Sequence, residues 1–215
     1  MTMDPQTATG SAAPRPALGP TLTLTIQDAS SWRPLSNGGP AEIWTGGRVV
    51  GGTLDRLLRG KPEGSTLRCW LARTEPGSPP SGDQPDDCVA AWDLEALAPE
   101  PIAWPEDAGA LFVVTMDIAP EAEGEFNDWY DTEHIPALVQ VPGVLSGRRF
   151  RALRGAPRYV AIYHLVGPDS YGSDVWCAAD RTPWIQRLRR YQSNRAYFMF
   201  RPGEPGRAAR WDQQR

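Results

Sequence analysis

The sequence has little lysine, histidine or cysteine among its 215 residues, and each shortage disfavours a class of chemistry. Lys61 is the only lysine, so a Schiff-base mechanism is not expected. The cysteines, Cys69, Cys88 and Cys177, lie far apart and form no CxxC pair, which argues against a zinc site or a disulfide framework. We therefore expect three reduced thiols in a cytoplasmic protein.

Motifs that would name a reaction are also missing. The chain has no GxGxxG after a predicted strand, no GxxxxGK[ST], no GxSxG and no HExxH. Two histidines are too few for a histidine-rich metal site, and Asp131 with His134 and a third ligand is only a weak alternative. We expect neither a metal nor another cofactor.

Charge and hydropathy point away from nucleic acids and membranes. The net charge is −4, and the short basic run at residues 187–190 is interrupted by a leucine, as is typical of a solvated helix face. The longest apolar runs, such as residues 111–116, are too short to span a bilayer, and no secretory signal is recognised. The expected partner is a small-molecule substrate, with no nucleic acid and no membrane.

The first half of the chain carries weak signals. Residues 1–20 are rich in Pro, Ala, Thr and Gly and are expected to form a disordered tail. Alternation of polar and apolar residues predicts a strand at 21–26. Further predicted segments are strands at 41–50, 65–73 and 88–94, a short helix at 53–58 and a loop at 77–87.

The second half carries sharper signals, after a proline-containing linker at 98–109. Strands are predicted at residues 111–118, 144–153, 158–166 and 195–201. Helices are predicted at 121–141 and 170–191, the second broken near 181–183. The order β-α-β-β-α-β is the ferredoxin-like pattern, an α+β fold with both helices on one face of an antiparallel sheet.

Such a sheet would leave its other face apolar and uncovered, so it should pack against a second sheet. We predict an α+β barrel made by a tandem pair within one chain, in which residues 21–97 are a degenerate ferredoxin-like half and 110–202 the regular domain. A C-terminal tail follows at 203–215. The alternative is a barrel closed between two chains, as a homodimer.

The predicted helix at 121–141 carries the most informative side chains. At 100° per residue, one face collects Phe126, Trp129, Tyr130, Glu133 and Ala137, with His134 at its border. Asp131 lies one turn before His134 and Tyr130 one turn before it on the same side. These residues predict a catalytic group of His134, Tyr130 and Asp131. The structural alternative is a histidine that only hydrogen-bonds Asp131 at the surface.

Other residues are candidates for substrate binding. Arg149 could hold a carboxylate or phenolate, although a solvated strand arginine is the commoner case. His164 shares a strand face with Val160 and Ile162, opposite Tyr163, and the sequence leaves open which face meets the helices. The predicted substrate-binding set is Trp129, Glu133, Arg149, Tyr163, His164, Trp176 and Trp184, of which the tryptophans could equally be core.

Residues 111 to about 202, a little under half of the chain, resemble the dimeric α+β barrel superfamily, close to its EthD-like members. The likeness rests on EFNDWYDTEHIP at 125–136, VPGV at 141–144, RRF at 148–150, GAPRY at 155–159 and TPW at 182–184. These motifs are specific for the fold and poorly specific for function. Members include lactone isomerases, polyketide cyclases, cofactor-free monooxygenases and haem-containing dye peroxidases.

The resemblance implies a pocket between helix and sheet, in which His134 and Tyr130 act on a small, often aromatic substrate. It argues against haem, because the second predicted helix has no histidine for the proximal position. The leading hypothesis is a cofactor-independent lyase, isomerase or cyclase with acid–base chemistry at His134. The alternatives are a non-catalytic small-molecule-binding or accessory protein and a cofactor-free monooxygenase.

Overall fold

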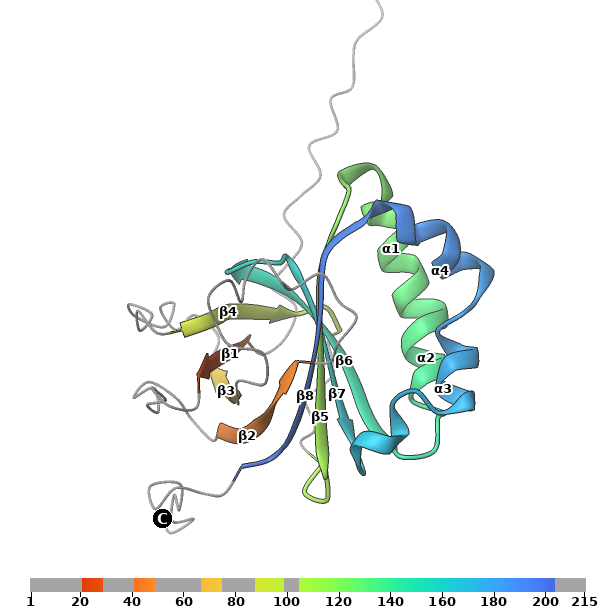
Figure 1. Ribbon diagram of the computed structural model, residues 1–215. Helices are drawn as coiled ribbons and strands as arrows, with labels where there is room; N and C mark the ends of the chain where they lie inside the picture. Colours follow the sequence, from red (N-terminus) through yellow and green to blue (C-terminus); the bar gives the residue numbers. More distant parts are fainter. Residues whose placement is uncertain (1–20, 29–40, 49–66, 75–87, 99–104, 204–215) are drawn as a thin grey trace, which may run out of the picture.

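A closed antiparallel barrel of eight strands forms the centre of the molecule (Figure 1). The structure, a computed structural model, describes residues 21–28, 41–48, 67–74, 88–98 and 105–203. The order around the barrel is β1-β3-β2-β8-β5-β7-β6-β4. The strands are β1 (Thr21–Asp28), β2 (Ala41–Arg48), β3 (Leu67–Thr74), β4 (Cys88–Ala96), β5 (Ala110–Ile118), β6 (Val144–Arg154), β7 (Tyr159–Leu165) and β8 (Gln192–Pro202).

The described helices all lie on one side of the barrel, outside the wall formed by β5 to β8 (Figure 1). The first layer is η2 (Pro120–Ala122), α1 (Glu123–Trp129), η3 (Tyr130–His134) and α2 (Ile135–Leu138). The second is η4 (Pro168–Ser170), α3 (Asp174–Ala179), α4 (Pro183–Leu188) and η5 (Arg189–Tyr191). None of these helices is long and apolar enough to cross a membrane.

The break in the second helical stretch falls at the predicted place. Residues 180–182 separate α3 from α4, and Thr182 caps the new helix by accepting a hydrogen bond from the Ile185 amide. Pro183 follows at the first helical position, where its missing N–H costs nothing. The chain therefore turns within this stretch, and α3 and α4 cover different parts of the sheet.

The α+β, ferredoxin-like class and the closure of the barrel within one chain are confirmed. Two seams join the halves, β2 with β8 and β4 with β6. The helix predicted at 53–58 and the loop predicted at 77–87 lie outside the described residues. The division into two domains and the possible homodimer stay predictions.

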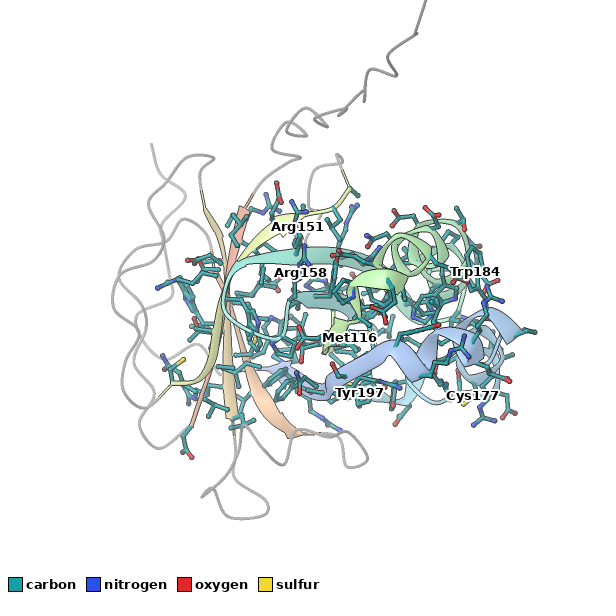
Figure 2. All side chains as sticks on the ribbon, turned by 90° about the horizontal axis from the view of Figure 1, so that it is seen from above. Met116, Arg151, Arg158, Cys177, Trp184 and Tyr197 are labelled. Atoms are coloured by element: carbon teal, nitrogen blue, oxygen red, sulfur yellow. The ribbon has the colours of Figure 1, made fainter. Side chains whose placement is uncertain are left out.

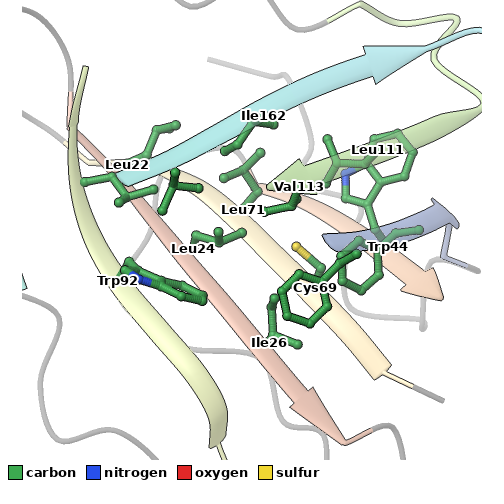
Figure 3. Close-up of a cluster of buried hydrophobic side chains, with 14 of the residues drawn as sticks. Leu22, Leu24, Ile26, Trp44, Cys69, Leu71, Trp92, Leu111, Val113 and Ile162 are labelled. Carbon is green, nitrogen blue, oxygen red and sulfur yellow. The ribbon is translucent and has the colours of Figure 1, made fainter. Parts of the chain in front are cut away.

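Strand alternation divides the buried side chains into two cores. On β7, Val160 and Ile162 point into the barrel, whereas Tyr159 and Tyr163 point toward the helices. Figure 3 shows the inner core, where Leu24, Trp92, Cys69, Leu111 and Ile162 from several strands meet. The inner face of the second-half sheet is thus covered by strands of the first half, as its apolar pattern requires.

Candidate functional site

A π-helical turn in the first helix shapes the candidate site. In η3 the amide of Ile135 donates to the carbonyl of Tyr130, five residues back, in place of the usual four. Pro136 explains the irregularity, because it has no N–H to give to the carbonyl of Thr132 and its ring crowds that carbonyl. The Thr132 hydroxyl instead donates to the Asp128 carbonyl at 2.7 Å.

The π turn rotates the rest of the helix relative to a regular α-helix. His134 and Leu138 are consequently buried, whereas Glu133 and Ala137, which the helical wheel placed on the buried face, are half-buried. This part of the wheel was wrong, because it assumed a constant 100° per residue through Pro136. His134 moves from the predicted border of the apolar face to its centre.

His134 is enclosed by aromatic rings. Its imidazole stacks on Trp129, with ring centroids 4.2 Å apart, and meets Tyr130 edge-on at 4.9 Å. Burial, helped by the nearby positive charge of Arg149, lowers the pKa of His134 to about 3. The imidazole is therefore neutral at physiological pH. Among the residues that the structure describes, Nδ1 of His134 has no hydrogen-bond partner.

A small cavity lies beside His134, between the helices and the sheet. Its volume is about 60 Å³. Figure 2 shows the side chains between barrel and helices, among which Met116 and Tyr197 are labelled. The sheet contributes Phe112, Val114, Met116, Tyr163, Gln192, Arg195 and Tyr197 to the cavity wall. The helices and the segments on either side of α3 contribute Trp129, Tyr130, His134, Leu138, Tyr171, Trp176, Asp180 and Ile185.

Two tyrosines at the cavity have raised pKa values and keep their phenol protons. Burial raises the pKa of Tyr130 to about 12, against the opposing effect of Arg149. Burial also raises the pKa of Tyr163 well above its usual value, and the neighbouring Tyr130 adds to this. Within the described part of the chain, the Tyr163 hydroxyl has no hydrogen-bond partner. The cavity thus offers a phenol O–H and an imidazole nitrogen that a ligand can engage.

A charged pair of side chains completes the cavity. Burial raises the pKa of Asp180, which Arg189 and Arg195 oppose, and burial lowers the pKa of Arg195. Arg195 lies in a β-bulge of β8, where the pairing with β5 shifts and Asn194 adopts a φ of +50°. The Asn194 amide donates to Asp117 at 2.7 Å, which holds this conformation. Bulges of this kind redirect side chains toward sites.

Three of the predicted substrate-binding residues, Trp129, Tyr163 and Trp176, line the cavity together with His134 and Tyr130. Arg149 lies behind Tyr130, with its guanidinium carbon 4.1 Å from the ring centroid. Sequence reasoning missed Arg195, Asp180 and Tyr171. Alternation along β8 could have paired Arg195 with Tyr197, but no local signal marks the other two.

Contrary to the prediction, Asp131 does not contact His134. Its carboxylate accepts a hydrogen bond from Arg149 Nη1 at 3.0 Å, and its side chain is 62% exposed. The π turn causes this difference, since it turns His134 inward while Asp131 stays on the outer face. Asn127 Oδ1 accepts from the other terminal nitrogen of Arg149 at 2.7 Å. Asp131 therefore fixes the arginine that packs on Tyr130.

Two other predicted residues support the helices from outside the cavity. Glu133 accepts a hydrogen bond from Trp129 Nε1 at 3.0 Å and another from the Thr182 hydroxyl. Trp184 donates through Nε1 to Glu125 at 2.9 Å, and Figure 2 shows it out among the helices. The contact of Glu133 with Thr182 and that of Glu125 with Trp184 tie the first helical layer to the second.

His164 faces the barrel interior, on the opposite side of the sheet from the cavity. Its ring meets Trp44 edge-on, with centroids 6.0 Å apart. The register explains the position, because His164 alternates with Tyr163 along β7. His164 therefore takes no part in the site around His134. Among the described residues, no group of three or more His, Cys, Asp or Glu side chains could hold a metal ion.

The buried neutral imidazole should make the protein sensitive to acid. Its pKa is about 3 when folded and 6.5 when unfolded, so between these values the unfolded chain binds more protons and the free energy of unfolding falls as pH falls. At pH 5 the loss relative to pH 7.5 should be about 2 kcal/mol. Urea unfolding of wild type and His134→Phe at both pH values measures it.

The difference between the two proteins isolates this group, because every other titrating residue is shared. The His134→Phe protein should lose about 2 kcal/mol less on acidification. An equal pH dependence in the two proteins would mean that His134 is not buried in its neutral form.

Comparison with known proteins supports the fold. No protein-family model matches the sequence, and no curated protein matches it. A candidate monooxygenase from Fusobacterium nucleatum has a similar structure, with a TM-score of 0.54 and 9% sequence identity over 87% of this chain and 94% of that one. At that identity the likeness shows a shared fold and no more.

Two solved structures from Listeria monocytogenes are more distant. One is an uncharacterized ferredoxin-fold protein related to antibiotic biosynthesis monooxygenases, with a TM-score of 0.46 and 10% identity over 87% of this chain and 97% of that one. The other is a heme-degrading enzyme, with a TM-score of 0.48 and 9% identity over 85% and 99%. The shared fold therefore rests on the Fusobacterium protein.

Proposed function

We propose that this chain is an enzyme that oxidises a small phenolic or polyketide-like aromatic molecule with O₂, without a cofactor, at the cavity beside His134. One observation carries the proposal: His134 and Tyr163 line an aromatic-walled cavity, and His134 Nδ1 and Tyr163 Oη are buried with no hydrogen-bond partner among the described residues. Leaving such groups unsatisfied costs about 1–3 kcal/mol each. A bound ligand would recover that free energy.

His134 is the proposed base. Its neutral form, favoured by the pKa of about 3, has a lone pair available for a substrate proton. Burial disfavours the imidazolium, but an enolate or phenolate formed beside it would stabilise the positive charge. The site therefore favours proton transfer only when a substrate anion is formed with it.

Tyr163 and Arg195 are the proposed stabilisers of that anion. Tyr163 keeps its proton because burial raises its pKa, so it can donate a hydrogen bond to the developing oxyanion. Arg195 brings a positive charge to the same cavity wall. The electron-rich anion then reduces O₂; for a substrate CH₂ group the balanced reaction is R₂CH₂ + O₂ → R₂C=O + H₂O, in which carbon is oxidised and O₂ reduced.

The size of the cavity implies that a substrate ring displaces a side chain. About 60 Å³ is well below the roughly 150 Å³ of a cavity that binds benzene. Tyr171 is the candidate for displacement, because it is half-buried and packs on Phe112 with ring centroids 4.4 Å apart. Gly172 follows with a φ of +77°, and a Cβ added there would meet nothing within 4 Å, so this backbone is free of close neighbours on that side.

The monooxygenase description of the structurally similar Fusobacterium protein favours oxidation over the acid–base reactions expected first. A lyase, isomerase or cyclase reaction, as in the EthD-like resemblance, would use the same His134 and tyrosines without consuming O₂. A non-catalytic binding protein would bind the same ligands unchanged.

Measurement of O₂ consumption with an oxygen electrode distinguishes oxidation from the alternatives that consume no O₂. The purified protein is incubated with a panel of phenols, anthrones and polyketide fragments, each also tested by thermal shift and mass spectrometry. We expect O₂ consumption equal to the product formed, and a ligand at about 100 times its dissociation constant should stabilise by roughly 2.7 kcal/mol. Conversion without O₂ uptake would instead establish a lyase or isomerase, and binding without conversion would establish a binding protein.

A further inference from the structure

A second group of polar side chains lies inside the barrel, on the other side of the sheet from His134. The Ser146 hydroxyl lies 3.1 Å from His164 Nδ1, and His164 Nε2 lies 3.0 Å from Glu42 Oε2. Trp44 Nε1 donates to the same Glu42 oxygen at 2.9 Å. These residues come from three strands, β6, β7 and β2, and Glu42 is 122 positions from His164 in the sequence. Barrel closure therefore assembles the group.

The direction of the hydrogen bonds follows from the chemistry of the groups. A carboxylate only accepts hydrogen bonds, so Nε2 of His164 carries the proton that is donated to Glu42. The neutral ring then has its lone pair on Nδ1, which accepts from the Ser146 hydroxyl. The negative charge of Glu42 is also felt at Cys69, where it adds to burial in raising the pKa of that thiol.

We propose that Ser146, His164 and Glu42 form a second reactive site, in which His164 activates Ser146 as a nucleophile toward small activated acyl esters. A hydroxyl bonded to an imidazole that a carboxylate orients is the arrangement that makes serine nucleophilic. The ring nitrogens are used in the opposite order to the chymotrypsin-like triad, but either lone pair can accept the proton. This site is independent of the cavity at His134.

The reaction balances within these residues and water. Ser146 Oγ bonds to the ester carbonyl carbon while its proton passes to His164 Nδ1, and the carbon–alkoxide bond breaks as that proton reaches the leaving group. Water then hydrolyses the acyl-serine, with His164 again accepting and returning a proton. The sum is ester plus water giving acid plus alcohol, with no change of oxidation state.

Burial and access fit this role. The His164 side chain is only 3% exposed, so its geometry is held by packing, whereas the Glu42 side chain is 22% exposed and Ser146 is half-buried. The site thus opens toward solvent at the serine and carboxylate. Nearby apolar groups are Trp44 and Leu145, which packs against the inner core. These apolar side chains favour a short apolar acyl group over a charged one.

The test uses the full chain with a fluorophosphonate probe and p-nitrophenyl acetate. We expect one-site labelling located at Ser146 by peptide mass spectrometry, together with release of p-nitrophenol. Ser146→Ala should abolish both, and His164→Gln should lower the labelling rate by about 10²–10⁴-fold, the range for a positioned base. Ser173 serves as the internal control, because its hydroxyl donates to the Ser170 carbonyl and has no such imidazole partner in the described structure.

Glu42→Gln is the conservative variant in case His164→Gln does not fold. It keeps an oxygen acceptor for Nε2 but loses the negative charge, so the labelling rate should fall while thermal unfolding stays close to wild type. Labelling of Ser146 no faster than that of Ser173 would overturn the proposal. A rate that is unchanged in either folded variant would also overturn it, leaving a structural hydrogen-bond chain.

Discussion

Replacing His134 by phenylalanine should lower the O₂-dependent turnover number by about 10²–10⁴-fold without destabilising the fold. Phenylalanine keeps a ring against Trp129, 4.2 Å away in the native stack, but removes both nitrogens. Because Nδ1 has no partner among the described residues, its replacement by carbon should be neutral or stabilising at pH 7.5. Steady-state O₂ consumption and urea unfolding measure the two effects.

The combination of lost turnover and retained stability is what separates a catalytic histidine from a structural one. If His134 were only structural, its replacement would lower turnover and stability together. A residue kept for function commonly costs stability, so its replacement can lower turnover alone. Asp128→Asn is the matched control, since Asp128 is exposed on the same helix and its side chain points away from the cavity. Turnover within about threefold of wild type in His134→Phe would remove His134 from the proposed mechanism.

The strands were predictable because their pattern is local. Alternation of polar and apolar residues marked β1, and an apolar run marked β5. The same local rules predicted a break in the second helical stretch near residues 181–183, where α4 begins. Closure of the barrel within one chain followed from the need to cover the inner apolar face, although the sequence also allowed closure between two chains.

The site was less predictable because its geometry depends on one irregular turn and on distant contacts. Pro136 was visible in the sequence, but the π turn that it favours reverses the positions of Glu133 and His134 relative to the sheet. Asp180 and Arg195 reach the cavity from separate segments, and no spacing rule connects them with His134. Long-range pairing also decided that His164 faces Glu42 across the barrel.

The seam between β2 and β8 has no room for an added methyl group at Gly46. Gly46 pairs with Phe200 in this seam, which is one of only two that hold the described halves together. A Cβ at residue 46 would overlap the carbonyl oxygen of Met199 and lie 2.6 Å from the Cα of Phe200. Both obstacles are backbone atoms, so no side-chain rotation can relieve the contact.

Gly46→Ala is therefore expected to lower the free energy of unfolding by at least about 3 kcal/mol, the upper end of ordinary overpacking. Gly124→Ala is the matched control, because residue 124 lies in α1 and a Cβ there meets nothing within 4 Å. That control should gain up to about 1 kcal/mol from the higher helix propensity of alanine. Urea unfolding of both proteins measures these changes. Equal stabilities would show that β2 and β8 do not approach each other so closely, and closure of the barrel within one chain would then lose its main physical support.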